Sequence, residues 1–166
     1  MSDSRFDEFE YLRFERDGDV LVVTVDKPED HLNKVDAQMH HELTGLFKVL
    51  REEREARAVL LAGTERAFAA GGDLRELAGL RTQTEAEKMA IDAKAAFNAI
   101  RDFPVPVIAG LNGNAFGGGA ELAVSCDFRV AAAHAKIGFV QGRLALATAW
   151  GGGPDLLDLV GRARGL

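Results

Sequence analysis

The distribution of hydrophobic and polar positions predicts that strands and helices alternate along this chain. Residues 11–16 and 20–26 alternate as half-buried strands do, and Asp17-Gly18-Asp19 between them is typical of a hairpin turn. Asp36 suits the N-cap of a helix, and apolar residues follow it at helical spacing. These residues are Met39, Leu43, Leu46, Phe47 and Leu50.

The rest of the pattern continues in the same way. In chain order it predicts a buried strand at 58–62, a short helical turn at 74–80, a helix at 84–101, a strand at 105–109, a helix from Gly118 or Gly119, a strand at 127–131 and a closing helix with Pro154 near its first position. Strands linked through helices are typical of an α/β fold. Because no repeat, low-complexity tract or linker interrupts the sequence, we expect an N-terminal tail over 1–10 and one domain over 11–166.

Composition excludes several classes of protein. The chain has 166 residues, of which 47% are hydrophobic and 28% charged, and these values are ordinary for a globular domain. Its net charge of −6 argues against a general nucleic-acid binder. The acidic N-terminus does not resemble a signal peptide, and no apolar run approaches the length of about 20 residues that spans a bilayer. We therefore expect a cytoplasmic protein that binds neither nucleic acid nor membrane.

The cysteine and histidines indicate neither a disulfide nor a metal site. Cys126 is the single cysteine, so it has no internal partner, and we expect it to be a buried small side chain. The pair His40 and His41 has no cysteine or carboxylate cluster at ligand spacing, and His134 is expected at the surface. The sequence predicts no bound metal.

Two glycine-rich stretches, "AFAAGGDL" at 67–74 and "GGGAE" at 117–121, suggest chemistry. Neither supplies GxxxxGK or GxGxxG, so nothing here favours a nucleotide fold. Such stretches form turns that need small residues, or they let the backbone approach a ligand closely. An N–H at the start of a helix has no helical acceptor and suits an anion. If Gly72 and Gly118 direct their N–H groups at one atom, they form an oxyanion hole for a carbonyl oxygen.

Together with "PVPVIAGLNGNAFGGGAELAVSCDFRVA" from Pro104, the first stretch resembles the crotonase superfamily, also called the enoyl-CoA hydratase/isomerase family. The resemblance runs from about Leu12 to the C-terminus. It implies a crotonase-type ββα spiral, an acyl-CoA thioester substrate in fatty acid metabolism, and a homo-trimer or hexamer. It implies no cofactor, since coenzyme A is part of the substrate. Chains of this family continue further, through C-terminal helices that this chain lacks, so we expect exposed apolar surface near its C-terminus.

The resemblance also implies roles for individual residues. The amides of Gly72 and Gly118 would bind the thioester oxygen of an enolate-like intermediate. Residues that would line the coenzyme A and thioester channel are His31, Leu32, Ala70, Asp73 and Leu74, and Trp150 is a further candidate for the pocket wall. From the residues alone, Asp73 also suits an N-cap and Trp150 also suits packing.

Glu121 and Gln141 are the candidate catalytic residues. Glu121 lies three residues after Gly118, on the same helical face. In the hydratases that this sequence resembles, this glutamate and a second one activate water, but the second position is Gln141 here. Glutamine orients water without exchanging a proton, and general acid–base catalysis by one group is worth roughly 10²–10⁴ in rate.

Three functions therefore stay open. The first is an enoyl-CoA hydratase or isomerase that stabilises a thioester enolate. The second is a decarboxylase of methylmalonyl- or ethylmalonyl-CoA, because loss of carbon dioxide makes the enolate without a base. The stretch "KIGFVQGRLALATAWGGG", with its Trp150, resembles that branch. The third is a non-catalytic protein that binds acyl-CoA or partner subunits.

Overall fold

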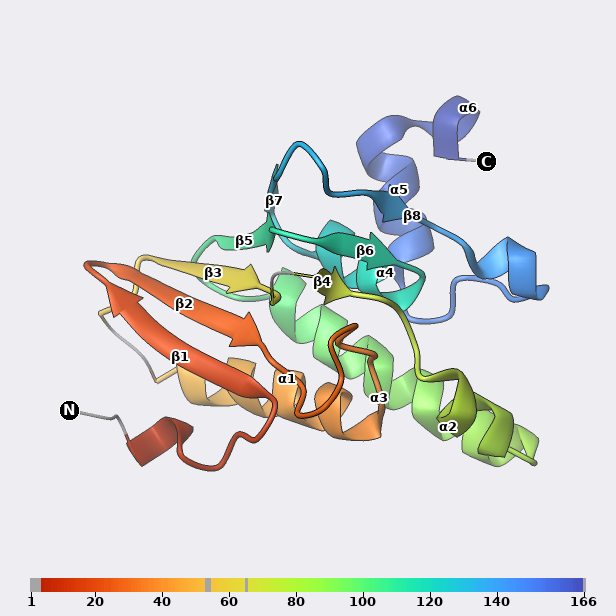
Figure 1. Cartoon of the computed structure of the whole chain (residues 1–166), viewed down its shortest axis with the longest axis horizontal. Coiled ribbons are helices and arrows are strands. Elements are labelled where there is room, and N and C mark those ends of the chain that lie inside the picture. The colour runs from red at the N-terminus through yellow and green to blue at the C-terminus, as the bar shows by residue number, and fades with distance from the viewer. Residues whose placement is uncertain (1–3, 53–54, 65, 166) are drawn as a thin grey trace.

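The computed structural model describes residues 4–52, 55–64 and 66–165. Within them, five strands form the main sheet in the order β1-β2-β3-β5-β7 (Figure 1). These strands are β1 Leu12–Asp17, β2 Val20–Val25, β3 Ala58–Ala62, β5 Val107–Leu111 and β7 Phe128–Ala131. Only β1 and β2 pair antiparallel, as the predicted hairpin requires, and the other neighbours are parallel. Parallel neighbours need crossover connections, which the helices supply.

A second, smaller sheet contains three very short parallel strands. They are β4 Ala67–Ala69, β6 Asn114–Phe116 and β8 Ile137–Gly138. The sequence pattern predicted a loop at β4 and a turn at the start of β6, and neither prediction describes these residues fully. Strands of two or three residues are too short to show an alternating pattern, so periodicity does not reveal them.

Helices connect the strands, and two of them, α1 and α3, cover one side of the main sheet (Figure 1). The α-helices are α1 Ala37–Leu50, α2 Leu74–Gly79, α3 Gln83–Arg101, α4 Gly118–Ser125, α5 Gly152–Val160 and α6 Arg162–Gly165, and 3-10 turns occupy Ser4–Phe6 and Gln141–Leu144. Asp36 is the N-cap of α1, as predicted, since its side chain accepts a hydrogen bond from the N–H of Met39. The closing helix begins at Gly152, two residues before Pro154.

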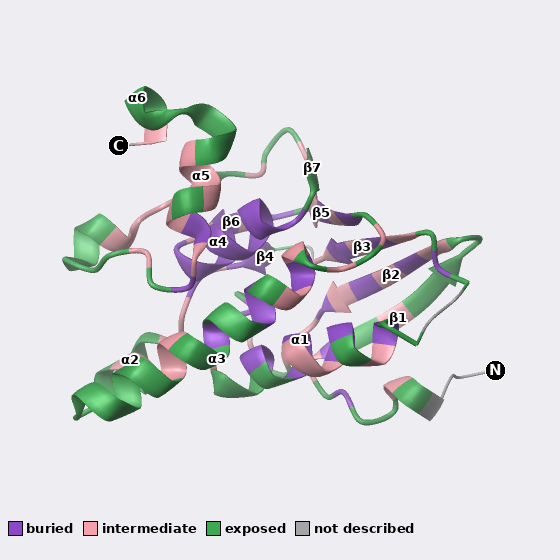
Figure 2. Cartoon of the chain, turned by 180° about the vertical axis from the view of Figure 1, so that it is seen from behind, coloured by how far each residue is buried: buried purple, intermediate pink, exposed green. Residues whose placement is uncertain are grey.

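The core lies between the main sheet and the pair α1 and α3, which pack on each other (Figures 1 and 2). Its fully buried side chains include Val23, Met39, Leu43, Leu46, Val59, Leu61, Phe97 and Val107. All eight residues of α4 are buried, so this helix runs through the interior. A fully buried helix rarely carries a glutamate, and this draws attention to Glu121.

The segment predicted as a tail packs on the domain. Phe9 is buried in the core, and the ring of Phe6 stacks on Phe14 with centroids 4.2 Å apart. The carboxylate of Glu42 on α1 accepts hydrogen bonds from the N–H groups of Glu10 and Tyr11. Residues 6–11 are thus anchored to α1 and β1.

Apolar side chains are exposed near the C-terminus, as predicted, and also elsewhere. Near the C-terminus they are Leu144, Leu146, Leu159 and Val160. Phe128 and Val130 on the edge strand β7 are 60% and 66% exposed, and Leu32, Leu74 and Ile91 are exposed earlier in the chain. Exposed apolar side chains in such numbers favour association. None of the helices in the described residues combines the length and apolar character needed to cross a membrane.

Candidate functional site

The two glycine-rich stretches lie side by side. Parallel pairing of β4 with β6 places Ala69 opposite Ala115. Beyond these strands the backbones touch, because a Cβ on Gly119 would come within 1.9 Å of the carbonyl oxygen of Ala69. A Cβ on Gly71 would lie 3.4 Å from the amide nitrogen of Gly118. Side chains at these glycines would push the stretches apart, so the glycines allow the close approach.

The N–H groups of Gly72 and Gly118 have no acceptor within residues 4–52, 55–64 and 66–165. Gly118 is the first residue of α4, so its N–H has no partner inside the helix. The residues on either side of Gly72 bond to Val35, whose N–H donates to Gly71 and whose carbonyl accepts from Asp73. Because successive residues of an extended segment point in opposite directions, the N–H of Gly72 points away from Val35. Two free donors thus occur on touching segments.

Asn33 fixes the predicted channel loop to the glycine stretch. Its buried side-chain amide donates to the carbonyl oxygens of Val25 at 2.9 Å and Ala67 at 3.2 Å, and its Oδ1 accepts from the N–H of Lys27 at 3.0 Å. Its φ of 49° is left-handed, a conformation that asparagine tolerates better than most residues. This role was not predicted from the sequence, where the available signal was an asparagine that follows an exposed turn.

The predicted channel residues fall at the surface beside this loop. The N–H of Ala70 donates to the carbonyl of Leu32 at 2.9 Å, so the structure brings these two residues together. His31 is exposed, and Leu32 and Leu74 are 50% and 55% exposed. Asp73 is the N-cap of α2, because its carboxylate accepts from the N–H of Arg75 at 2.9 Å. The capping interpretation of Asp73 is thereby confirmed.

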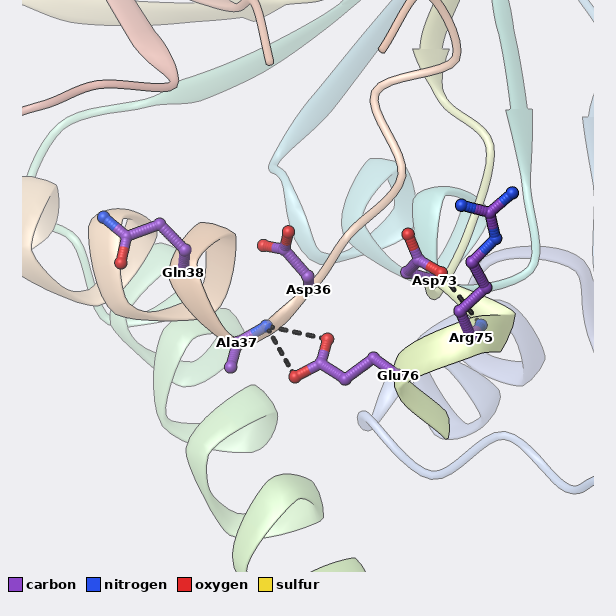
Figure 3. A pocket seen from close by; sticks show the side chains of 6 residues that line it. All are labelled: Asp36, Ala37, Gln38, Asp73, Arg75 and Glu76. Carbon is purple, nitrogen blue, oxygen red and sulfur yellow. Dashed lines mark hydrogen bonds between the residues drawn. The ribbon is translucent and has the colours of Figure 1, made fainter. Parts of the chain in front are cut away.

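A pocket of about 300 Å³ lies next to Asp73, between the starts of α1 and α2 (Figure 3). Its lining residues are Asp36, Ala37, Gln38, Asp73, Arg75 and Glu76. The carboxylate of Glu76 accepts from the N–H of Ala37, and burial together with the neighbouring Asp36 and Asp73 raises the pKa of Glu76. Two of the three lining carboxylates are paired with lysines, Asp36 with Lys27 and Asp73 with Lys34, so the charges around this pocket are largely balanced.

Glu121 is a buried carboxyl held by several hydrogen bonds. Its side chain is only 2% exposed, and Oε2 accepts from the N–H groups of Trp150 at 3.1 Å and Gly152 at 2.9 Å. Burial raises the pKa of Glu121, while these hydrogen bonds act in the opposite direction. A fixed carboxyl whose pKa is raised from 4.5 is suited to proton transfer.

Gln141 lies against Glu121, so the structure brings the two candidate catalytic residues together. Its Nε2 donates to Oε1 of Glu121 at 2.8 Å. A carboxylate only accepts, and the amino end of Gln141 therefore faces it. The remaining Oε1 of Gln141 is buried and has no partner among the described residues. This oxygen is available to accept a hydrogen bond from water or a ligand.

The indole of Trp150 packs against both Gly72 and Gly118, whose N–H groups have no acceptor in the described part of the chain. A Cβ on Gly118 would come within 1.7 Å of Cζ3 of the indole, and a Cβ on Gly72 would lie 3.1 Å from Cη2. Its position next to the site was predicted, whereas the contact with both glycines was not.

A salt bridge holds the segment that binds Glu121. Arg101 at the end of α3 contacts Asp155 of α5 at 2.6 Å, and both side chains are largely shielded from solvent. The guanidinium also lies beside Gly151, where a Cβ would be 2.9 Å from a guanidinium nitrogen. Gly151 has a φ of +109°, which a side chain would disfavour. This bridge fixes the turn whose amides orient the glutamate.

No group of three or more histidine, cysteine or carboxylate side chains is placed to bind a metal in the described part of the chain. Cys126 is buried, as predicted, and burial raises the pKa of its thiol to about 12. His40 is only 3% exposed, and neither ring nitrogen has a described partner. Burial lowers its pKa to about 4, so the ring is neutral. The burial of His40 was not predicted from the sequence.

The chain is similar to known proteins along most of its length. Residues 15–165 match the model of the family described as Enoyl-CoA hydratase/isomerase. The chain is 34% identical over 155 residues to the short-chain-enoyl-CoA hydratase of Clostridium acetobutylicum, covering 93% of this chain and 59% of that protein.

Solved structures are similar over nearly the whole chain. The structure of Pseudomonas aeruginosa DspI has a TM-score of 0.90 and 32% identity, covering 99% of this chain and 62% of that one. The crystal structure of enoyl-CoA hydratase from Bacillus anthracis has a TM-score of 0.88 and 32% identity, covering 94% and 60% of the two chains. The chain thus spans about 60% of the length of these relatives.

Proposed function

This chain belongs to the enoyl-CoA hydratase/isomerase family of the crotonase superfamily, and we propose that it acts on acyl-CoA thioesters by stabilising a thioester enolate. In this proposal the N–H groups of Gly72 and Gly118 hold the thioester oxygen. Both are free donors on touching segments. Removing one such donor typically costs about 10²–10³ in rate.

The observation that carries the proposal is the placement of Glu121. It lies on the first turn of α4, three residues after Gly118, and its carboxylate is buried and held by two backbone amides. A group in this position reaches the carbon skeleton beside a carbonyl bound at Gly118. Its raised pKa favours reversible protonation. We assign Glu121 as the group that transfers the proton.

Hydration of an enoyl thioester follows from these roles. The free Oε1 of Gln141 accepts a hydrogen bond from a water molecule. Glu121 takes the other proton of this water while the water oxygen forms a bond to the β-carbon. The electrons of the double bond move onto the thioester oxygen, between the two amides. Glu121 then returns the proton to the α-carbon. One carboxyl thus serves both proton transfers.

Decarboxylation of a malonyl-type thioester is a second candidate, and Gln141 favours it. The bond to the carboxylate breaks, carbon dioxide leaves, and the electron pair forms the same enolate without a base. Protonated Glu121 then supplies the proton to the α-carbon. Burial raises the pKa of Glu121 and so favours its protonated form. This chemistry needs only one carboxyl, which is what the site contains beside Gln141.

A third candidate is acyl-CoA or subunit binding without turnover. Gln141, which stands beside Glu121 and cannot exchange a proton as a carboxyl does, favours it. Assembly as a trimer or hexamer and a cytoplasmic location belong to the proposal as predictions. The exposed apolar side chains of β7 are consistent with assembly.

Product analysis tests these functions. The purified chain is incubated with crotonyl-CoA and ethylmalonyl-CoA, and the products are identified by mass spectrometry. Addition of water to crotonyl-CoA supports the hydratase, and loss of carbon dioxide from ethylmalonyl-CoA supports the decarboxylase. If neither substrate changes while both bind, the chain is a binding protein and the enzymatic proposal is wrong.

Two variants connect the result to the site. Glu121→Gln should retain acyl-CoA affinity and lose turnover by about 10²–10⁴. Gln141→Glu should raise hydration, because it restores a second group that exchanges protons. Undiminished turnover in Glu121→Gln would exclude the proposed role of this residue.

A further inference from the structure

The indole of Trp150 spans the two glycines of the proposed oxyanion hole. Its atoms Cζ3, Cη2 and Cζ2 form one edge of the six-membered ring. Cζ3 lies nearest to a Cβ position on Gly118, and Cη2 and Cζ2 lie 3.1 and 3.3 Å from a Cβ position on Gly72. The same residue donates its backbone N–H to Glu121. The ring thus borders both glycines of the proposed oxyanion hole, while the backbone of the same residue holds the carboxyl of Glu121.

Side chains from two helices hold the ring from the other side. The indole N–H contacts Sδ of Met89 on α3 at 3.3 Å. The rings of His40 on α1 and Phe97 on α3 meet it edge-on, with centroids 4.7 and 6.0 Å away. Trp150 is only 6% exposed. The space that leads from the glycines toward α1 and α3 is therefore filled by the indole.

An acyl chain bound with its thioester oxygen at these amides must extend from the carbonyl carbon into the neighbouring space. The indole blocks the route toward the core. We propose that Trp150 is a specificity-determining residue that limits the acyl group to short chains, of crotonyl or butyryl size. This inference rests on the proposed acyl-CoA function, and it names the substrate class within it.

Core packing alone would not produce this selectivity. If the ring served only to fill the interior, a smaller apolar residue would lower stability and leave the ranking of acyl chains unchanged. If the ring is the end of the acyl pocket, the same change opens space lined by Met89, His40 and Phe97. Longer chains then gain apolar contact that they lack in the natural protein.

Calorimetric titration with butyryl-CoA and octanoyl-CoA tests the proposal, because neither saturated thioester is a hydration substrate. The natural chain should bind butyryl-CoA more tightly by at least about tenfold, since one methylene too many in a pocket changes affinity by about 10–200-fold. Trp150→Leu and Trp150→Ala should reverse this order. Phe47→Leu is the control for a smaller core side chain. Phe47 packs on Phe103, so this variant should still bind butyryl-CoA more tightly than octanoyl-CoA.

Fluorescence of the natural chain gives a second measurement that does not depend on a folded variant. Trp150 is the only tryptophan in the sequence, so its emission reports this site alone. Butyryl-CoA should change the emission at the concentrations at which calorimetry detects binding. Binding that leaves the emission unchanged would place the acyl group elsewhere and overturn the proposal.

The outcomes separate this proposal from the proposed function. Equal affinity for both chain lengths in the natural protein, or an unchanged order in the Trp150 variants, overturns the size limit while acyl-CoA binding stands. Absence of binding to either thioester, in the natural chain and in both variants, overturns the acyl-CoA function and the size limit with it. Selective binding without turnover supports the size limit and contradicts only the catalytic assignment.

Discussion

The indole of Trp150 packs directly on Gly118, at a distance where a single added methyl group at Gly118 would come within 1.7 Å of the ring. Gly118 is the first residue of α4, and its free N–H is one of the two donors of the proposed oxyanion hole. The pair explains why this helix begins with a residue that has no side chain. The absence of a Cβ serves the packing of Trp150 as much as access for a substrate.

Gly118→Ala should destabilise the fold through this contact. Overpacking a buried site costs about 1–3 kcal/mol, and Trp150→Ala alone should cost about 3–5 kcal/mol through the cavity that it creates. The double variant should be more stable than the sum of the single effects predicts, because the added methyl group then has room. Urea unfolding of the four proteins measures this coupling. Gly79→Ala is the control, since a Cβ there meets no atom within 4 Å.

Strict additivity of Gly118→Ala and Trp150→Ala would contradict the contact. A destabilisation in Gly79→Ala as large as that in Gly118→Ala would show that the effect belongs to alanine in a helix and not to the clash.

The pH dependence of turnover should reveal which proton transfer Glu121 performs. Burial raises its pKa above the ordinary 4.5, so the carboxyl changes protonation at a higher pH than an exposed glutamate. As a base in hydration it must be ionised, and kcat/KM for crotonyl-CoA should fall as the pH decreases through this pKa. As an acid in decarboxylation it must be protonated, and activity should fall as the pH rises through the same pKa. Glu121→Gln should lack this limb in either case.

Steady-state rates measured across the pH range in which the fold stays intact decide whether Glu121 acts as a base in hydration or as an acid in decarboxylation. Residual activity in Glu121→Gln that kept the same limb would assign the ionisation to another group.

His40 should make the fold sensitive to acid. Its pKa is 6.5 in an exposed setting and about 4 in the folded protein, where burial disfavours the charged ring. Between these values the unfolded chain binds more protons than the folded one, so stability decreases as the pH falls from about 6.5 toward 4. At pH 5 the loss from this residue should reach about 2 kcal/mol relative to neutral pH.

His40→Leu should remove this contribution and be no less stable than the natural chain at pH 7, because both buried ring nitrogens are without a described partner. Urea unfolding at pH 7 and pH 5 measures both effects. His41→Gln is the matched control, since His41 is exposed on the same helix. The interpretation fails if His40→Leu loses as much stability between these pH values as the natural chain.

Asn33→Ala should destabilise the fold more than most single substitutions. It removes the side-chain partner of the buried carbonyls of Val25 and Ala67 and of the partly buried N–H of Lys27, and each buried group left unsatisfied costs about 1–3 kcal/mol. Alanine in the left-handed backbone conformation at φ 49° also lowers the free energy of unfolding by about 1–2 kcal/mol. Asn33→Gly should lose the hydrogen bonds without this strain.

Guanidinium unfolding of the two Asn33 variants separates hydrogen bonding from backbone strain. Equal stabilities would show that the backbone conformation contributes nothing, and natural stability in Asn33→Gly would show that the hydrogen bonds do not hold the loop.

Local signals accounted for much of the fold. The hairpin of β1 and β2, the Asp36 cap and the start of α4 agree with the sequence because alternation, capping residues and glycines act within a few residues of each other. The short strands β4, β6 and β8 were not predicted, because they consist of two or three residues that become strands only when the fold brings them together.

The sequence by itself determined the α/β class, the two glycine stretches and the place of Glu121 one turn into a helix, because each depends on neighbouring residues. Only the tertiary structure decided that Gln141 donates to Glu121, that His40 is buried and that Trp150 covers both glycines. These contacts join residues that are distant in the chain, and packing of α1, α3 and α4 sets their distances. Periodicity carries no information about such distances, so the shape of the site emerged only with the fold.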